Sequence, residues 1–150
     1  MANTAYHPAT LRPSVKGMFE SLGLSRNLVE AHMCIIAGMS PEVVTRFADL
    51  LGLTPRTACQ LVGIRPGTLA YRIRSTAHLS LEQGARVYWV VQVLDAAIQL
   101  FDGDVDGALT WMEQPARGLR GERPVDLLTT AMGAEAVITL ANQIQHGVVI

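Results

Sequence analysis

Hydrophobic residues recur along this chain at helical spacing, and no segment alternates as a half-buried strand would. Val43, Phe47 and Leu50–Leu51 share one face of a helix that is expected to begin near Ser40. Near the C-terminus, a further helix is marked by positions three and four apart: Ala134, Val137, Ile138, Leu140, Ala141 and Ile144. The pattern therefore predicts an all-α fold.

Start and stop signals bracket these segments. Ser40-Pro41 and Thr54-Pro55 each place a capping side chain before a proline at the first helical position, and Ser80 with Gln83 has the spacing of a capping box. A short helix is predicted over residues 124–132. Glycines that follow the periodic runs predict where helices end or separate: Gly38, Gly52, Gly63, Gly103, Gly133 and Gly147.

The longest predicted helix, Leu81–Phe101, is apolar on nearly all sides. Val87, Val91 and Leu94 lie on one face at helical spacing, while Val93 and Leu100 make the opposite face apolar as well. A helix of this kind is buried on both sides. Two interpretations stay open: the helix has a surface for self-association or for a protein partner, or it is the central helix of one monomeric core.

Composition narrows the class of protein. Of 150 residues, 49% are hydrophobic and 17% are charged, which argues against a long disordered polar tail, and a formal net charge of −1 argues against a histone-like cation. There is no pattern of a signal peptide, and the apolar run over residues 87–101 is too short to cross a bilayer. We expect a soluble cytoplasmic protein without a membrane partner, in which Cys34 and Cys59 are reduced and buried.

Charge is segregated along the sequence. Between Leu53 and Leu81 there are four arginines and no acid, whereas Val87–Glu113 holds five acids and no base. Within the basic segment, small Ala58 and Cys59 allow two helices to cross closely and Gly63 permits a sharp turn. Ile64 and Leu69 would pin the second helix against the first. This is the layout of a helix-turn-helix, whose second helix enters the major groove of DNA.

Side chains expected to contact operator DNA lie in and beside that second helix. Arginine reaches guanine edges or phosphates, and hydroxyl groups suit phosphate oxygens. The candidates are Arg56, Arg65, Gly67, Thr68, Tyr71, Arg72 and Arg74. Arg65 stands where a capping serine is usual, and Arg72 stands where an apolar anchor is common. The alternative interpretation is an ordinary pair of helices with a solvated basic face.

Residues that would support catalysis or bind a metal do not form a convincing pattern. The four histidines are scattered, no nucleophile has a partner at the right spacing, and we expect no enzyme activity, no cofactor and no metal site. One formal match is a calcium-binding loop over Asp102–Asp106 with Glu113 downstream. The same acids are also expected as caps of a short helix.

The C-terminal half resembles a known family. The runs Leu79–Arg86, Ala108–Pro115, Gly121–Gly133 and Ile144–Gly147 are similar to the toxin-binding domain of Xre/MbcA/ParS-type antitoxins. The series W-x-x-x-P and R-P-x-x-L-L-x-T-x-x-G carries most of this resemblance, which covers about residues 40–150. The order of a Cro-like helix-turn-helix followed by this domain also matches the family.

This resemblance implies an antitoxin of a type II toxin–antitoxin pair, with a RES-domain toxin that destroys NAD as its partner. It implies that the antitoxin covers the active-site entrance of the toxin and represses its own operon. The implied division is an N-terminal arm and helix (1–39), a helix-turn-helix region (40–78) and a toxin-binding domain (79–150). The expected toxin-binding residues are Trp111, Gly118, Leu119, Arg120, Gly121, Arg123, Pro124, His146, Gly147, Val148, Val149 and Ile150.

Several expectations accompany this assignment. A homodimer should form through apolar surface left over on the Leu81–Phe101 helix. Of the expected toxin-binding residues, Trp111 is the one that we expect to lie in the core instead, because an indole at helical spacing is more often part of the core. Two alternative functions are a stand-alone dimeric transcription regulator and an interaction adaptor that never touches DNA.

Overall fold

The computed structural model describes residues 17–147, and this part of the chain forms helices and turns with no strand. The all-α prediction is therefore confirmed. In chain order the helices are α1 (Met18–Ser21), α2 (Leu28–Ala37), α3 (Glu42–Leu51), α4 (Pro55–Val62), α5 (Pro66–Arg74), α6 (Leu81–Leu100), α7 (Val105–Met112), the 3-10 helices η3 (Arg117–Leu119) and η4 (Pro124–Leu127), and α8 (Ala131–Gln145).

Two of the three predicted caps form as side-chain hydrogen bonds, whereas at α3 the N-cap is Pro41, which makes no such bond. Thr54 Oγ1 accepts from the backbone N–H of Thr57 at 3.1 Å, which begins α4. At α6, Ser80 Oγ accepts from Gln83 N at 3.2 Å and Gln83 Oε1 accepts from Ser80 N at 3.0 Å, so the capping box is complete. These local signals fix where α4 and α6 start.

Gly133 is a correction to the sequence analysis, because it lies in the first turn of α8 and does not end a helix. Its N–H is capped by Thr130 Oγ1 at 3.0 Å. A Cβ at Gly133 would collide with the backbone carbonyl of Leu127, the last residue of η4. The helix expected over residues 124–132 is accordingly a 3-10 turn that stops at Leu127, packed closely on the start of α8.

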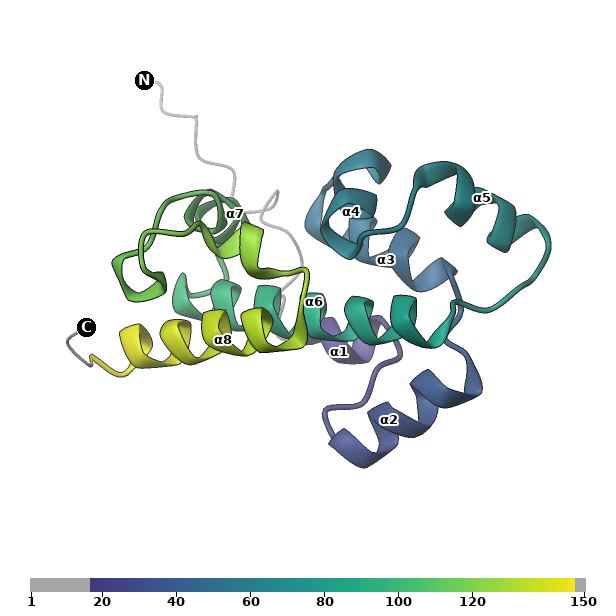
Figure 1. Cartoon of the computed structure of the whole chain (residues 1–150), viewed down its shortest axis with the longest axis horizontal. Coiled ribbons are helices and arrows are strands. Elements are labelled where there is room, and N and C mark those ends of the chain that lie inside the picture. Colours follow the sequence, from purple (N-terminus) through teal and green to yellow (C-terminus); the bar gives the residue numbers. More distant parts are fainter. Residues whose placement is uncertain (1–16, 148–150) are drawn as a thin grey trace, which may run out of the picture.

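Helix α6 is the central helix of the fold (Figure 1). It runs the length of the molecule, with α8 beside it, α7 at one end, and α2 and α4 packed on its other half. Its apolar residues are buried on all sides: Val87, Val90, Val91, Val93, Leu94, Ala96, Ala97 and Ile98. Over residues 87–98, the surface predicted to be left over for a homodimer is therefore covered by neighbouring helices of the same chain.

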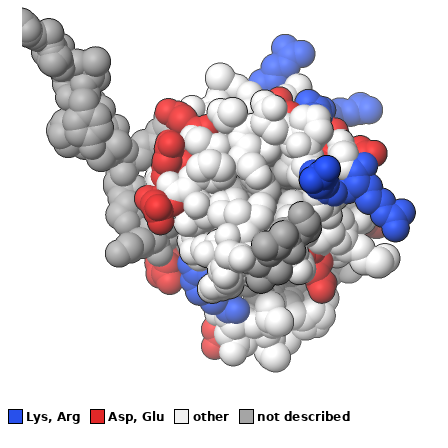
Figure 2. Space-filling model, turned by 90° about the vertical axis from the view of Figure 1, so that its left-hand side faces the viewer, with Lys and Arg blue, Asp and Glu red and all other residues white. Residues whose placement is uncertain are grey.

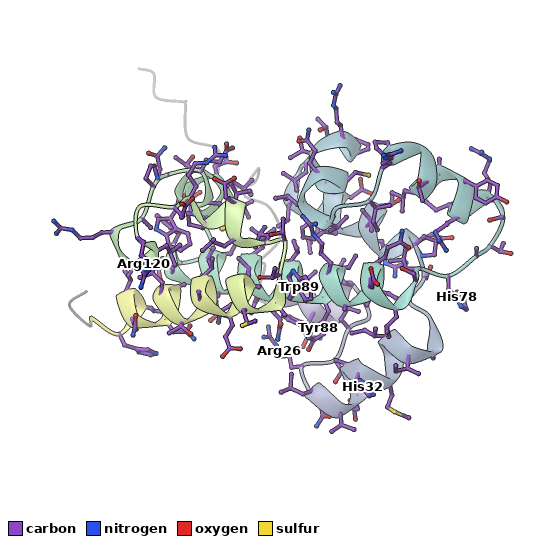
Figure 3. The ribbon with its side chains drawn as sticks, viewed as in Figure 1. Arg26, His32, His78, Tyr88, Trp89 and Arg120 are labelled. Carbon is purple, nitrogen blue, oxygen red and sulfur yellow. The ribbon has the colours of Figure 1, made fainter. Side chains whose placement is uncertain are left out.

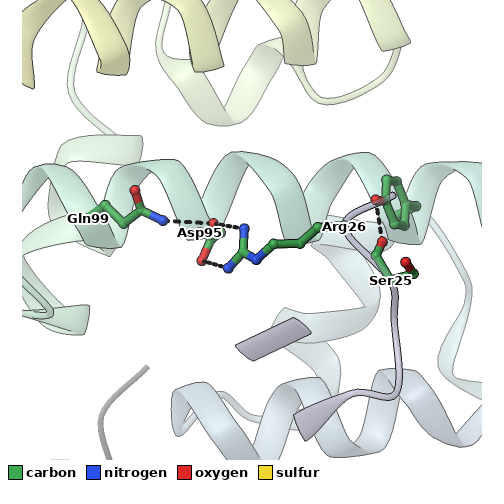
Figure 4. Close-up of polar contacts among 5 residues, drawn as sticks. Ser25, Arg26, Asp95 and Gln99 are labelled. Carbon is green, nitrogen blue, oxygen red and sulfur yellow. Dashed lines mark hydrogen bonds and ion pairs between the residues drawn. The ribbon is translucent and has the colours of Figure 1, made fainter. Parts of the chain in front are cut away.

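A polar cluster ties the segment before α2 to α6 (Figure 4). The Arg26 guanidinium donates to both carboxylate oxygens of Asp95, at 3.1 and 3.4 Å, and lies 4.3 Å from the ring centre of Phe19. Gln99 donates to the same carboxylate at 3.0 Å, and the Tyr88 hydroxyl donates to the Ser25 carbonyl at 2.7 Å. Asp95 is the one buried charged residue of the described chain, and these partners satisfy it.

Candidate DNA-binding and partner-binding surfaces

Helices α4 and α5 form the helix-turn-helix that the sequence predicts. Gly63 ends α4 in the left-handed conformation, with φ of 70°, which glycine adopts without strain. Ala58 and Cys59 are buried at the crossing, and Ile64 and Leu69 are buried beneath α5, so each predicted packing role is confirmed. Burial raises the pKa of the Cys59 thiol above its ordinary value.

Arg86 of α6 supports this turn, a role that the sequence analysis missed. Its Nη2 donates to the Leu61 carbonyl at 3.2 Å, and its buried Nε has no hydrogen-bond partner in the described structure. A Cβ on Gly63 would collide with the Arg86 guanidinium. Desolvation lowers the pKa of Arg86. The turn of the helix-turn-helix is therefore packed directly on the central helix.

The exposed face of α5 carries most of the predicted DNA contacts. Arg65, Gly67, Tyr71 and Arg74 are exposed, and Tyr71 keeps 63% of its surface accessible. Arg56 is exposed on α4. Arg65 makes no side-chain cap at the start of α5, so its guanidinium is not used to begin the helix. These side chains form a basic surface without an acid in the segment that supplies it.

Two of the predicted positions are less accessible than expected. Thr68 and Arg72 are half-buried. Arg72 Nη1 donates to the His78 carbonyl at 2.6 Å, which ties the end of α5 to the segment that leads into α6. Its side chain therefore stabilises the chain after α5, because it turns toward that segment and away from the exposed face. Arg65 and Arg74 are the better candidates for contacts with phosphate.

At the other end, the loop between α7 and α8 is held by ion pairs. Arg123 donates to Asp126 through Nε at 2.8 Å and through Nη2 at 2.9 Å, and it lies 3.8 Å from a Glu113 oxygen. This bond holds the pKa of the Asp126 carboxyl below its ordinary value. Pro124, predicted to bind the toxin, is buried, because it anchors the start of η4 in the core. Arg120 is exposed, with φ of 58°.

A groove with a volume of about 430 Å³ lies between this loop and α8. Its lining residues are Gly118, Leu119, Met132, Glu135, Ala136, Thr139, Leu140 and Gln143. Gly118 and Leu119 were predicted for the toxin surface, and Leu119 is largely buried at the base of the loop. The sequence analysis did not predict that residues of α8 line this surface. A signal was present for Met132, because it falls outside the apolar face that marks this helix in the sequence, and it is 84% exposed.

The other predicted toxin-binding residues lie apart from the groove lining. Trp111 is half-buried, with its ring centre 6.5 Å from that of Phe101. This agrees with the expectation that the indole is part of the core. His146 and Gly147 are exposed beyond the last turn of α8. Val148, Val149 and Ile150 lie outside the described residues.

The formal calcium loop is a helix cap in the structure. Asp104 Oδ1 accepts from Gly107 N at 3.1 Å and begins α7. Over residues 17–147, no three side chains of His, Cys, Asp or Glu come together as metal ligands, and no helix is long and apolar enough to cross a membrane. Cys34 and Cys59 are both free, but Cys34 is exposed on α2, contrary to expectation, because α2 turns that flank away from α6.

The basic helix and the groove lie at opposite ends of the molecule. Arg120 of the α7–α8 loop is at one end, and His78, just after α5, is at the other (Figure 3). Figure 2 shows the end formed by the α7–α8 region, where much of the visible middle is uncharged, acidic side chains are more frequent on the left, and arginines are more frequent on the right. An uncharged centre with charges of both signs at its edge is typical of a protein-binding surface.

The structure thus combines a helix-turn-helix at one end with a grooved helical region at the other. Residues 30–92 match the antitoxin Xre-like helix-turn-helix domain, and residues 96–147 match the antitoxin Xre/MbcA/ParS C-terminal toxin-binding domain. An antitoxin Xre of Yersinia enterocolitica is 32% identical over 96% of this chain and 97% of that protein. The chain therefore belongs to the Xre family of type II antitoxins.

Two other relatives extend the comparison. An antitoxin Xre of Photorhabdus laumondii is 34% identical over 60% of this chain and 61% of its own length. A Sphingobium protein named Prs ADP-ribosylating antitoxin is 25% identical over 73% of this chain and 74% of its own length. Helix α6 spans the residues where the two matched domains meet, so one helix contributes to both.

Proposed function

We propose that this protein neutralises a RES-domain toxin that degrades NAD, by covering the active site of the toxin, and that it represses its own operon. In this proposal the chain is not an enzyme, acts in the cytoplasm, needs no cofactor, and binds operator DNA as a homodimer. The observation that supports the proposal is the separation of two surfaces on one core: the basic face of α5 and the groove beside α8.

The DNA end suits a polyanion. Arg65 and Arg74 are exposed on α5 and form none of the described ion pairs, so their charges are available to phosphates. The Tyr71 hydroxyl lies on the same short helix and can donate to a phosphate oxygen. Arg86 fixes the turn that sets the direction of α5, so this surface is held in place before DNA arrives.

The toxin end suits a protein surface. Met132 projects beside a groove whose other lining residues are small, apolar or uncharged, apart from Glu135. Exposed methionine and a preformed groove favour an apolar segment of a partner. The tail His146–Ile150, which follows α8, is proposed to enter or cover the NAD cleft.

The test is co-expression with the neighbouring reading frame, followed by purification, a growth assay and measurement of cellular NAD. Full-length protein should co-purify with the toxin and preserve NAD. Deletion of Gly147–Ile150 should restore NAD loss although the truncated protein stays folded. The matched control replaces Val148–Ile150 by three other apolar residues, which keeps the length and the apolar character of the tail. Normal growth of cells that contain the truncation and active toxin would contradict the role of the tail.

A second candidate partner comes from the Sphingobium relative, whose name refers to ADP-ribosylation of Prs. In that case the toxin would transfer the ADP-ribose of NAD to a protein and would not simply degrade NAD. Mass spectrometry of cellular proteins after toxin release distinguishes the two: modified protein supports this candidate, and NAD loss without modification supports the first. The alternative function of a stand-alone regulator predicts that the protein binds its promoter and that the neighbouring reading frame does not encode a toxin.

A further inference from the structure

Helix α2 exposes a continuous stripe of large apolar side chains. Its buried side consists of Ala31 and the half-buried Ile35, which face α6. The other large apolar side chains are exposed, with exposed fractions of 69% for Leu28, 70% for Val29, 62% for Met33 and 56% for Ile36. Leu28 borders the buried side, and the other three lie farther round the helix. Successive members are one, three or four positions apart, so they occupy neighbouring positions on one side of a ten-residue helix.

This stripe differs from the other exposed apolar side chains of the described chain. Those are Tyr71 on α5, Leu81 at the start of α6, and Met132 and Ile144 on α8, so they are spread over three helices. Single exposed apolar residues are ordinary, whereas a contiguous group on a protein of this size marks an interaction surface. Helix α2 therefore presents apolar surface that the fold of one chain does not cover.

We propose that the α2 stripe packs against the α2 stripe of a second copy of this chain. The proposal builds on the DNA-binding part of the proposed function, because helix-turn-helix proteins read two half-sites as two-fold dimers. A second copy is the occupant that the charge pattern favours. In a two-fold interface each residue near the axis meets itself, so a charged stripe would repel its copy. The stripe contains no charged residue, and Glu30 and Cys34 lie on the other exposed flank.

The size of the stripe is consistent with a pair. Four side chains at roughly 100 Å² each would bury about 800 Å² between two copies, before neighbouring atoms are counted, which approaches the ~1,000 Å² expected of a specific interface. In an antiparallel pair, Leu28 and Val29 of one helix would face Ile36 of the other. His32, midway between Leu28 and Ile36 on α2, would then lie near the two-fold axis (Figure 3).

The position of α2 leaves both proposed binding surfaces free. Helices α2 and α5 lie on opposite sides of α6, and the α8 end lies farther along the molecule (Figure 1). A pair formed through α2 would therefore hold two copies of α5 outward, without covering the groove. The sequence pattern placed the dimer surface on the helix that is apolar all round. The structure uses that helix for the core and leaves α2 for association.

Sedimentation equilibrium of the full chain, without DNA or toxin, tests the proposal. We expect a dimer at micromolar concentration, and Met33→Glu should weaken association at least 100-fold because it places like charges on both sides of the interface. The matched control is Leu81→Glu, an exposed apolar residue of α6 outside the stripe, which should remain dimeric. Circular dichroism checks that both variants stay folded. A monomeric parent, or a Met33→Glu variant that stays dimeric, would overturn the proposal.

Disulfide formation gives a second measurement that does not depend on disruption. His32→Cys in a Cys34→Ala background should form a covalent dimer on mild oxidation, because two residues beside the axis come within disulfide reach. The parent chain, whose exposed Cys34 lies on the other flank, should not. Equal cross-linking of both would overturn the α2 pairing. A monomeric parent would also count against the homodimer of the proposed function, whereas a Met33→Glu variant that stays dimeric would overturn the α2 pairing alone. Failure of the parent chain to protect cells would count against neutralisation and leave the α2 pairing standing.

Discussion

The two ends of the molecule differ in how they use arginine. At the α5 end, Arg65 and Arg74 are exposed and form none of the described ion pairs, and the segment around them has no acid. At the α8 end, Arg123 is bound by Asp126 and Glu113, and the adjacent groove is lined mainly by uncharged side chains, although Arg117 and Arg120 of the same loop are exposed. Unpaired basic charge suits phosphate, whereas a groove with satisfied charges suits a shaped protein surface.

Helix α6 explains how the two ends coexist. It supports the helix-turn-helix through Arg86 and packs along α8 at its other half. Because its own residues are buried, α6 contributes rigidity to both ends and little binding surface. We therefore expect changes in α6 to affect both functions together, and changes at either end to affect one function.

The largest effect is expected from Leu94→Ala in the middle of α6. Leu94 is fully buried, so the substitution should lower the free energy of unfolding by about 2–5 kcal/mol through lost burial and the cavity left behind. Chemical denaturation measures this, and promoter binding and toxin neutralisation should decline in parallel at raised temperature. Ile144→Ala, at a partly exposed residue of α8, is the control and should change stability by less than about 0.5 kcal/mol. Similar losses in both variants would argue against a central role for α6.

The next effect concerns DNA alone. Arg65→Ala with Arg74→Ala should weaken promoter binding by about 1–3 kcal/mol for each arginine that reads a base, and should reduce the salt slope by about one for each phosphate that is no longer neutralised. Fluorescence anisotropy across a salt series measures both quantities. Arg117→Ala with Arg120→Ala removes the same charge at the other end and should leave the affinity unchanged. Equal losses from the two pairs would show that only net charge matters.

A comparable change at the groove should affect the toxin alone. Met132→Glu places a charge beside apolar lining and should weaken toxin binding at least tenfold, about 1.4 kcal/mol or more. Competition binding with the co-purified toxin measures it. Leu81→Glu is the matched control, because it adds the same charge at an exposed apolar position far from the groove. Unchanged toxin affinity in Met132→Glu would remove the groove from the interface.

The smallest effect is a pH dependence in the helix-turn-helix. Burial raises the pKa of Cys59 above the ordinary 9.0, so the unfolded chain loses this thiol proton first as pH rises. The folded state then binds more protons, and stability should fall from about pH 9 upward, by less than about 1 kcal/mol. Denaturation midpoints at pH 7.5 and 9.5 should differ more for the parent than for Cys59→Ala. Identical pH dependence of the two proteins would contradict a buried, protonated thiol.

Local chemistry made much of the fold predictable from the sequence. Thr54, Ser80 and Gly63 act within a few residues of their own position, so the start of α4, the start of α6 and the turn before α5 follow from short motifs. The resemblance identified the family and the order of its two domains, which the family comparison also shows. The basic face of α5 followed from the distribution of charge.

Contacts between distant segments could not be predicted in this way. Arg86 donates to the Leu61 carbonyl, 25 positions away, and Arg26 pairs with Asp95, 69 positions away, so both contacts depend on how separate helices come together. Apolar periodicity showed that α6 is buried without showing what covers it. For the same reason the exposed stripe of α2 was missed, since an apolar face in sequence does not say which of two faces meets the core.

The separation of the two ends is tested most directly by the toxin affinity of a chain whose DNA binding is weakened. Isothermal titration of purified toxin into the Arg65→Ala/Arg74→Ala variant compares its Kd with that of the parent. If the two surfaces are separate, the toxin Kd should stay within about twofold of the parent (~0.4 kcal/mol), although promoter binding is weakened. A toxin Kd that weakens in step with DNA affinity would contradict this separation, because the two surfaces would then form one site.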